Sequence, residues 1–143
     1  MSVQLNPYLS FRGNASQAMD FYHSVFGGEL TRSTFGEFNA STDPAEKDLI
    51  MHSQLVTGDG LVLMVSDVPS HMEYQVGTNN FSVSLSGGTD DDARLRGYWE
   101  KLSSGGNVLA SLEVAPWGDT FGMCVDQFGI TWLVNISGQQ AQG

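Results

Sequence analysis

The sequence predicts an α+β fold made of two copies of one pattern, a strand, a helix and three further strands. Residues 5–11 and 80–85 alternate apolar and polar side chains, which is typical of half-buried strands. Each is followed by apolar residues at helical spacing that stop at a glycine pair, Gly27-Gly28 or Gly105-Gly106. Each half then closes with two short strands around a glycine-containing turn. This agreement in order favours an internal duplication.

In the first half, each element has its own signal. Asn14 and Gln17 have the spacing of a capping box and predict the start of the helix. Gly60 predicts the turn of a hairpin. The expected elements, in chain order, are a strand at 5–11, a helix from 14 to 26, a strand at 29–38, a polar loop at 39–48, and strands at 49–57 and 61–66.

The second half repeats this order. Three acids after Thr89 suit the positive end of a helix dipole and predict a helix start there. The expected strands lie at 80–85, 107–114, 121–125 and 130–135, with a hairpin turn at Gly129. The sequence therefore predicts one domain, with module one at about 3–67, a connection at 68–78, module two at about 79–136 and a polar tail at 137–143.

Composition excludes several classes of protein. The 143 residues include 16 acidic and 6 basic ones, for a net charge of −10. Nucleic-acid binding needs clustered Lys and Arg, and anionic membranes attract the same residues, so neither partner is expected. The single cysteine, Cys124, excludes an internal disulfide and a cysteine-rich zinc site. No apolar run of signal or membrane-spanning length is present, so we expect a globular protein of the cytoplasm.

Four stretches resemble one known family. They are NPYLSFRGNASQAMDFYHSVFGGEL (6–30), IMHSQL (50–55), LVLMVSD (61–67) and WGDTFGMCVDQFGITWLVN (117–135). Together they resemble the vicinal-oxygen-chelate superfamily of glyoxalases, bleomycin-resistance proteins and extradiol dioxygenases, and more closely its PhnB-like branch. The resemblance implies two βαβββ modules whose mixed sheets curve around a central ligand cavity, in a homodimer.

The same branch also carries a 3-demethylubiquinone methyltransferase label. Methyl transfer commonly uses S-adenosylmethionine, and no glycine-rich loop opens a helix in the way that a dinucleotide-type site requires. We therefore do not expect methyltransferase activity.

Metal-dependent members of this superfamily hold a divalent ion with His and Glu from the first and last strand of each module. These positions fall on Asn6, Met64, Asn80 and Leu133. None is a carboxylate or an imidazole, which are the ligands such ions prefer. We therefore predict no metal ligand and no cofactor at these four positions, while ligands displaced to other positions, such as His52, Asp67 or Glu37, stay open.

The sheet face opposite the helices is the expected ligand wall. His52 is the one titratable group on it suited to acid–base catalysis, the alternative being a structural imidazole. Trp117 could supply a stacking surface, and Asp119 either a hydrogen-bond acceptor or a turn acid. The predicted ligand contacts are Asn6, Tyr8, Gln54, Met64, Ser66, Asn80, Ser82, Trp117, Asp119 and Leu133.

This mixed polar and apolar wall suits an uncharged or weakly polar organic molecule. The sequence thus predicts a small-molecule binding protein or a metal-independent enzyme. One alternative is a metal-dependent lyase or dioxygenase with displaced ligands. A second is a drug-sequestering resistance module, with which the net negative charge is compatible.

Overall fold

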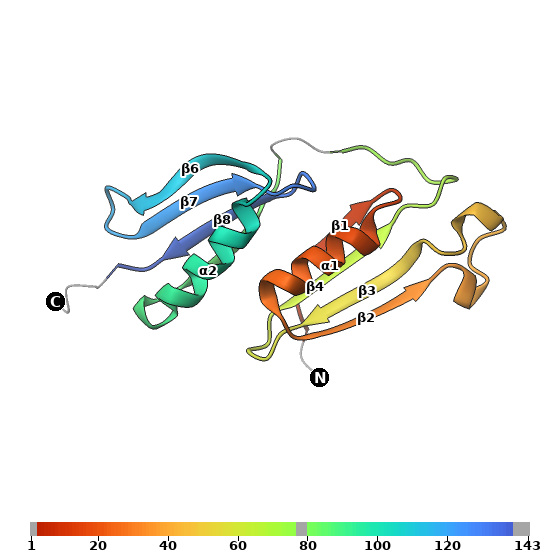
Figure 1. The fold of residues 1–143 in the computed structure, drawn as a ribbon, viewed down its shortest axis with the longest axis horizontal. Coiled ribbons are helices and arrows are strands. Elements are labelled where there is room, and N and C mark those ends of the chain that lie inside the picture. Colours follow the sequence, from red (N-terminus) through yellow and green to blue (C-terminus); the bar gives the residue numbers. More distant parts are fainter. Residues whose placement is uncertain (1–2, 77–79, 139–143) are drawn as a thin grey trace. The chain divides into compact units, whose positions relative to one another are not determined.

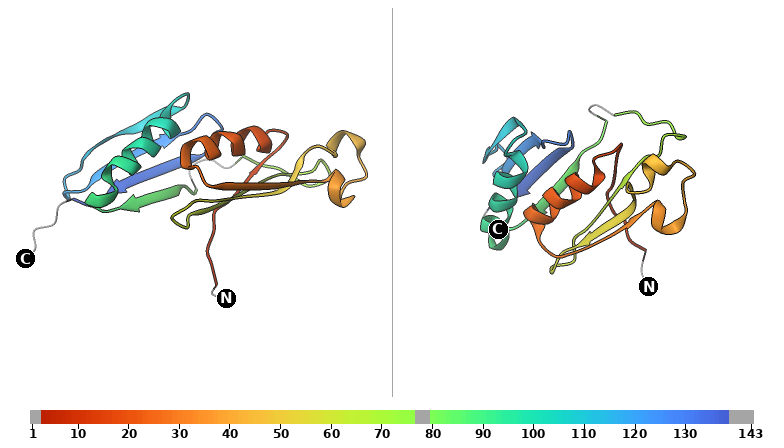
Figure 2. Two further views of the ribbon diagram at one scale, coloured as in Figure 1. Left: turned by 60° about the horizontal axis from the view of Figure 1, so that its bottom comes forward. Right: turned by 45° about the vertical axis from the view of Figure 1, so that its right-hand side comes forward.

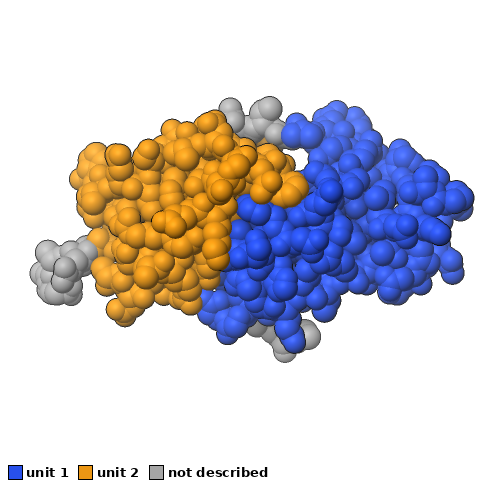
Figure 3. All heavy atoms as spheres, in the orientation of Figure 1, with its two compact units in different colours: residues 1–76 blue, residues 77–143 orange. Residues whose placement is uncertain are grey.

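The computed structural model describes residues 3–76 and 80–138. The chain divides into two compact units, residues 1–76 and residues 77–143 (Figure 3). Each unit is built from one of the two sequence repeats. We call them unit 1 and unit 2.

Unit 1 is a four-stranded mixed sheet with one helix (Figure 1). Its elements are β1 (Tyr8–Phe11), α1 (Ala15–Phe26), β2 (Glu29–Thr34), β3 (Ile50–Val56) and β4 (Val62–Asp67), with short 3₁₀ turns at Gly36–Phe38 and Pro44–Glu46. The strand order is β1-β4-β3-β2. β1 runs parallel to β4, and the other neighbours are antiparallel.

Unit 2 has the same architecture. Its elements are β5 (Val83–Gly87), a 3₁₀ turn (Thr89–Asp91), α2 (Asp92–Ser103), β6 (Asn107–Val114), β7 (Thr120–Val125) and β8 (Thr131–Ile136). The order β5-β8-β7-β6, with β5 parallel to β8, reproduces that of unit 1. The predicted α+β fold of two βαβββ modules is confirmed, and the two sheets are not closed into a barrel.

Each helix covers one face of its own sheet (Figure 2). In unit 1 the buried side chains of Met19 and Tyr22 from α1 share the core with those of Leu55 and Val65 from the sheet. Because successive residues of a strand point to opposite faces, one alternating set of each strand is buried under the helix. The remaining set forms the face that carries the candidate site.

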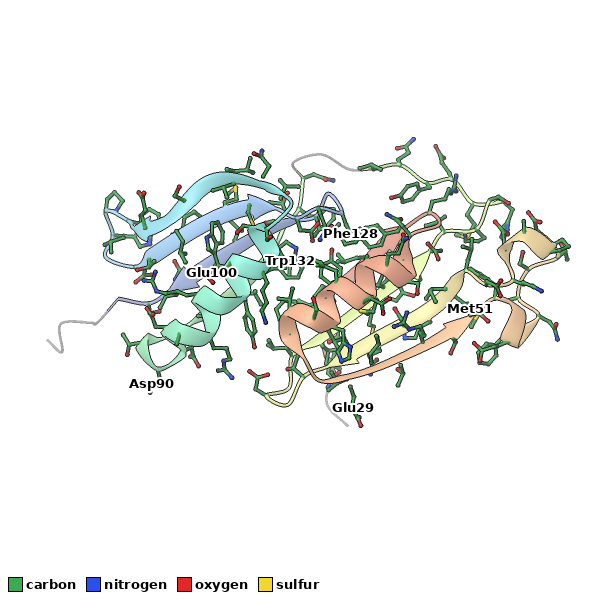
Figure 4. All side chains as sticks on the ribbon, in the orientation of Figure 1. Glu29, Met51, Asp90, Glu100, Phe128 and Trp132 are labelled. Carbon is green, nitrogen blue, oxygen red and sulfur yellow. The ribbon has the colours of Figure 1, made fainter. Side chains whose placement is uncertain are left out.

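The core of unit 2 is built by the same rule. Leu95 of α2 packs with Val134 and Ile136 of β8, and Trp99 of the helix lies against this cluster. Trp132, labelled in Figure 4, belongs to the same alternating set of β8 and is 1% exposed. No helix formed by the described residues is long and apolar enough to cross a membrane.

The glycine pairs after the helices are equivalent in structure. A Cβ atom on Gly28 would lie 2.3 Å from the carbonyl oxygen of Val56, and one on Gly106 would lie 2.1 Å from that of Val125. In both units, therefore, the chain can pass from the helix into the next strand only because the second glycine of the pair carries no side chain.

The predicted capping box of α1 is wrong. Asn14 makes no capping hydrogen bond. The first helical turn is instead held by Asp67, whose Oδ1 accepts hydrogen bonds from the backbone N–H groups of Gly13 and Ala15. A carboxylate distant in sequence satisfies the helix terminus, so local spacing could not reveal it.

Three strand boundaries differ from the predictions. β1 begins only at Tyr8, so Asn6 precedes it, and Leu5 is fully exposed. β5 begins at Val83 and leaves Asn80 and Ser82 outside the sheet. β2 ends at Thr34, where the chain turns into a 3₁₀ helix instead of continuing to residue 38.

Candidate functional site

The helix-free face of unit 1 carries four of the ten predicted ligand contacts, namely Tyr8, Gln54, Met64 and Ser66, together with His52. On β1, Leu9 and Phe11 are buried, whereas Tyr8 and Ser10 occupy the alternate positions and are exposed. The same alternation on the other strands completes this face. Its central residues are Tyr8, Ser10, Thr31, Ser33, His52, Gln54, Val56, Val62, Met64 and Ser66.

Strand register places four of these side chains in one row across the sheet. Tyr8 pairs with Met64, Met64 with Gln54, and Gln54 with Thr31. Neighbouring residues in a row lie about 5 Å apart. The row therefore presents a phenol, a thioether, an amide and a hydroxyl to the same side.

A second row lies next to it. Ser10 pairs with Ser66 at one side, and His52 pairs with Ser33 at the other. Ser66 is 8% exposed, whereas Ser10 is open to solvent. The two rows together form a polar surface with apolar side chains beside it.

Tyr8 and His52 are joined across the two rows. The Tyr8 hydroxyl lies 3.1 Å from Nδ1 of His52, and the ring centroids are 5.7 Å apart at an interplanar angle of 36°. The contact links β1 to β3 above β4. It is the one hydrogen bond between two side chains of the helix-free face among the residues that the structure describes.

The remaining polar groups of this face have no partner in the part of the chain that the structure describes. The side chains of Ser10, Ser33, Gln54 and Ser66 make no hydrogen bond within residues 3–76 and 80–138. On the helix side the situation is the reverse, since the hydroxyl of Ser53 donates to the carbonyl oxygen of Val65 at 2.6 Å. The helix-free face thus concentrates hydrogen-bonding capacity that the protein itself does not use.

This face is nearly free of charge. Glu29, the first residue of β2 (Figure 4), pairs with Val56 and is the one carboxylate in the alternating sets of this face. Arg12 is occupied by the carbonyl oxygens of Val68, Pro69 and Met72. Arg32 points to the helix side, where it lies 2.6 Å from Asp20. The surface is therefore suited to an uncharged ligand.

The residues present do not fit a divalent metal. Register places Tyr8 beside Met64 in unit 1 and Ser84 beside Leu133 in unit 2, where a chelating pair would need carboxylates or imidazoles. Within the described ranges, no three His, Cys, Asp or Glu residues are grouped so as to hold a metal ion.

The displaced ligands considered from the sequence are not brought together either. Asp67 lies in the helix-side set and accepts three backbone hydrogen bonds, from Gly13, Ala15 and Ile50. Glu37 accepts from the backbone N–H and the hydroxyl of Thr34. His52 lies on the opposite face from Asp67, so the two cannot share an ion.

Unit 2 uses its predicted site residues differently. Leu133 lies on the helix-free face in a row with Ser84, Met123 and Ala110. A neighbouring row places Asn135 between Ser86 and Phe121. This face is more apolar than that of unit 1, because Met123, Leu133, Phe121 and Val125 lie in its alternating sets.

Asp119 makes two hydrogen bonds within unit 2. Its carboxylate accepts from the backbone N–H of Gly138 at 2.8 Å and from the amide of Asn135 at 3.1 Å. These hydrogen bonds, that of Gly138 first, hold the pKa of Asp119 below its ordinary value. Trp117, which is 63% exposed, lies edge-on to Phe121 with centroids 5.8 Å apart.

The equivalence drawn between Asn6 and Asn80 is off by two residues. Thr57 in unit 1 corresponds to Asp126 in unit 2, because the backbone N–H of each donates to the carbonyl oxygen of the residue that follows the turn glycine. Met64 then corresponds to Leu133. Since Tyr8 pairs with Met64 and Ser84 with Leu133, the true counterpart of Tyr8 is Ser84.

Thr31 and Ser33 of β2 were not predicted as site residues. Their alternation with Arg32 was the available signal, because it assigns them to the face that His52 and Gln54 occupy. The sequence of this edge strand, ELTRST, contains one aliphatic residue and gives no clear indication of a buried side, so it does not predict a ligand contact there.

Comparisons with known proteins agree with this architecture. The family model described as the glyoxalase/bleomycin resistance protein/dioxygenase superfamily matches residues 4–134. The crystal structure of PA1353 from Pseudomonas aeruginosa is 37% identical, covers 96% of this chain and 100% of its own, and has a TM-score of 0.78. The PhnB protein of Bacillus cereus shares the fold at 22% identity, with a TM-score of 0.72, covering 94% of this chain and 100% of its own.

Among curated proteins, Protein YjdN of Escherichia coli is 28% identical over 96% of this chain and 98% of its own length. The family model spans nearly the whole chain, in agreement with the duplicated fold. The chain belongs to the glyoxalase/bleomycin resistance protein/dioxygenase superfamily.

Proposed function

We propose that this protein binds a small, uncharged organic molecule on the helix-free face of unit 1, without the help of a metal ion. The observation that carries the proposal is the group of unused polar side chains there. Gln54, Ser66 and the Nε2 atom of His52 have no hydrogen-bond partner in residues 3–76 and 80–138. Since no side-chain nitrogen or oxygen buried from solvent lacks a partner among the described residues, these three groups reach solvent and are open to hydrogen bonds with a ligand.

The chemistry of the face supports a neutral ligand. Binding a phosphate or phosphonate dianion would call for Arg or Lys, and neither type occurs in its alternating sets. A cationic drug would call for several carboxylates or an aromatic cage, whereas Glu29, the first residue of β2, is the one carboxylate in the alternating sets of this face. The drug-sequestering alternative is therefore less well supported on this face.

The metal-dependent lyase or dioxygenase alternative is also less well supported. It needs at least two or three carboxylate or imidazole ligands around one ion. His52 is the one imidazole on the helix-free face, and Asp67 is already committed to three backbone N–H groups. We propose that the protein needs no cofactor for binding. The homodimer is a further proposal from the family resemblance, and sedimentation velocity tests it.

The test combines metal content with thermal stability. Untagged protein purified without chelators is analysed for metal, and its Tm is then scanned against Mn, Fe, Co, Ni, Zn and Mg and against a panel of neutral organic compounds. We expect substoichiometric metal, no chelator-reversible shift of Tm, and a rise of Tm with particular neutral compounds. Near-stoichiometric metal, or a shift that chelator reverses, would overturn the proposal in favour of metal chemistry.

A further inference from the structure

We propose that Tyr8 fixes the tautomer of His52, so that the Nε2–H group of this imidazole is offered to the carbonyl oxygen of an uncharged ligand. The inference rests on the proposed function and adds to it the donor and the ligand class. Its starting point is the contact between the Tyr8 hydroxyl and Nδ1 of His52 at 3.1 Å.

The direction of this hydrogen bond follows from the two groups. A phenol is a strong donor and a weak acceptor, because its oxygen lone pair is delocalised into the ring. The unprotonated nitrogen of a neutral imidazole is a strong acceptor. The favoured arrangement is therefore O–H···Nδ1, with Tyr8 donating. In a neutral imidazole whose Nδ1 accepts, the proton is carried by Nε2.

The Nε2–H group then lacks an acceptor. His52 makes no further hydrogen bond in the described ranges 3–76 and 80–138, and its side chain is half-buried. No side-chain nitrogen or oxygen buried from solvent lacks a partner among the described residues, so this donor reaches solvent, where the acceptor of a bound molecule can take the place of water.

Gln54 supplies a second adjustable group near the same place. It follows His52 by two residues on β3 and therefore points to the same face, about 7 Å further along the strand. Its amide can donate to a carbonyl oxygen or accept from an adjacent N–H. The thioether of Met64, paired with Gln54, offers a polarisable surface for the apolar part of the ligand.

Charge selects among ligands that carry such an oxygen. A carboxylate would arrive without any cation in the alternating sets of this face to balance it, and desolvating it would be costly. A ketone, ester or amide oxygen accepts the same hydrogen bonds at a far smaller desolvation cost. The geometry thus points to a neutral carbonyl compound with an apolar body.

The first experiment reads the tautomer directly. Long-range ¹H–¹⁵N correlation spectra of the ¹⁵N-labelled protein are recorded at a pH above the range in which imidazoles titrate, with His52 assigned from the spectrum of His52→Gln. We expect the Nε2–H pattern for His52, and a change in its ring nitrogen shifts in Tyr8→Phe, which removes only the hydroxyl. An Nδ1–H pattern, or spectra identical in Tyr8→Phe, would overturn the inference and leave the proposed function standing.

The second experiment tests the ligand class with three probes of similar shape, namely acetophenone, benzoate and benzylamine. We expect acetophenone to perturb the ring nitrogens of His52 and the side-chain amide of Gln54, and to bind more tightly than the two charged probes. His52→Phe, which retains a ring but no donor, should weaken acetophenone binding about fivefold, and His52→Gln, which restores a donor, should recover part of the loss.

The outcomes separate the two proposals. Equal binding of the charged probes, or unchanged affinity in His52→Phe, would overturn the carbonyl inference while the binding face remains. If no probe and no compound of the neutral panel perturbs Gln54, Met64 or His52, the proposed function itself fails.

Discussion

The carboxylate of Asp67, the last residue of β4, lies 3.1 Å from the backbone nitrogen of Ala15, the first residue of α1. The same oxygen accepts from the N–H of Gly13 at 2.7 Å, and the other oxygen accepts from that of Ile50 at 2.9 Å. Asp67 is 3% exposed. One buried side chain therefore holds the start of the helix and the start of β3 against the end of β4.

Replacing Asp67 by Asn should destabilise the protein substantially. The amide retains one acceptor oxygen and turns an N–H₂ group toward a backbone N–H, so at least one buried donor loses its partner. Hydrogen bonds to charged groups are worth about 1.5–3 kcal/mol each, and we expect a loss of about 3 kcal/mol in the free energy of unfolding. Urea unfolding measures it. Asp48→Asn, at an exposed turn, is the matched control and should cost less than about 0.5 kcal/mol. Equal effects of the two substitutions would contradict this role of Asp67.

Gly27 and Gly28 should respond very differently to alanine. Both have positive φ angles, +69° and +91°, which residues with a side chain rarely adopt, so each substitution strains the backbone at a cost of about 1–3 kcal/mol. A Cβ on Gly27 would meet nothing within 4 Å, whereas one on Gly28 would lie 2.3 Å from the carbonyl oxygen of Val56. We therefore expect Gly28→Ala to lower the free energy of unfolding well beyond Gly27→Ala. A Gly28→Ala protein as stable as the Gly27→Ala protein would show that β2 and β3 do not approach as closely as described.

Cys124 should be chemically silent in the folded protein. Burial, and to a smaller extent the nearby charge of Asp126, raises the pKa of its thiol to about 11. At neutral pH very little thiolate is present, and the thiolate is the reactive form. A thiol-reactive disulfide reagent should label Cys124 in denaturant but only slowly without it. Rapid labelling of the native protein would place the thiol in a more open and more polar setting.

Glu46 should contribute to the acid sensitivity of unit 1. The N–H of Ser70 and the hydroxyl of Ser41 donate to its carboxylate, and in that order they hold its pKa below the ordinary value. A lowered folded-state pKa adds stability above the unfolded pKa, and this stability is lost as the pH falls through the folded one. The free energy of unfolding should therefore fall less between neutral and acidic pH in Glu46→Gln than in the unsubstituted protein. Parallel pH profiles for the two proteins would rule out this contribution.

The order of elements could be predicted because it depends on local patterns. Alternation along β3 and β4 and the glycine pair before β2 each mark a boundary within a few residues. The start of α1 could not be predicted, since the group that caps it, Asp67, is 52 residues away from Ala15. β2 ends earlier, and β1 begins later, than the sequence predicts. Both differences have the same origin, because pairing partners on other strands decide where a strand begins and ends.

The candidate site was predicted only in part. Tyr8, Gln54, Met64 and Ser66 share one face because the alternation of each strand is legible in the sequence. The hydrogen bond between Tyr8 and His52 joins strands 44 residues apart and follows from the parallel pairing of β1 with β4.

In unit 2, the pairing of strands determines the partners of Asp119 and the residue equivalent to Asn6, and neither can be read from local sequence patterns. Asp119 is bound by Asn135 and Gly138 at the end of β8, so its carboxylate is already committed. The two-residue shift between Asn6 and Asn80 arises in the same way, since the loops between the first and last strands differ in length in the two units and only pairing with the last strand fixes the equivalence.

The most direct test of a metal-independent binding face is chemical-shift mapping with neutral compounds in the presence of excess chelator. We expect the shift changes to cluster at Tyr8, His52, Gln54 and Met64. The affinity should fall in Gln54→Ala but not in Gln17→Ala, the same substitution at an exposed position of α1. Binding that disappears with chelator, or changes that spare this face and respond equally to both substitutions, would contradict the account.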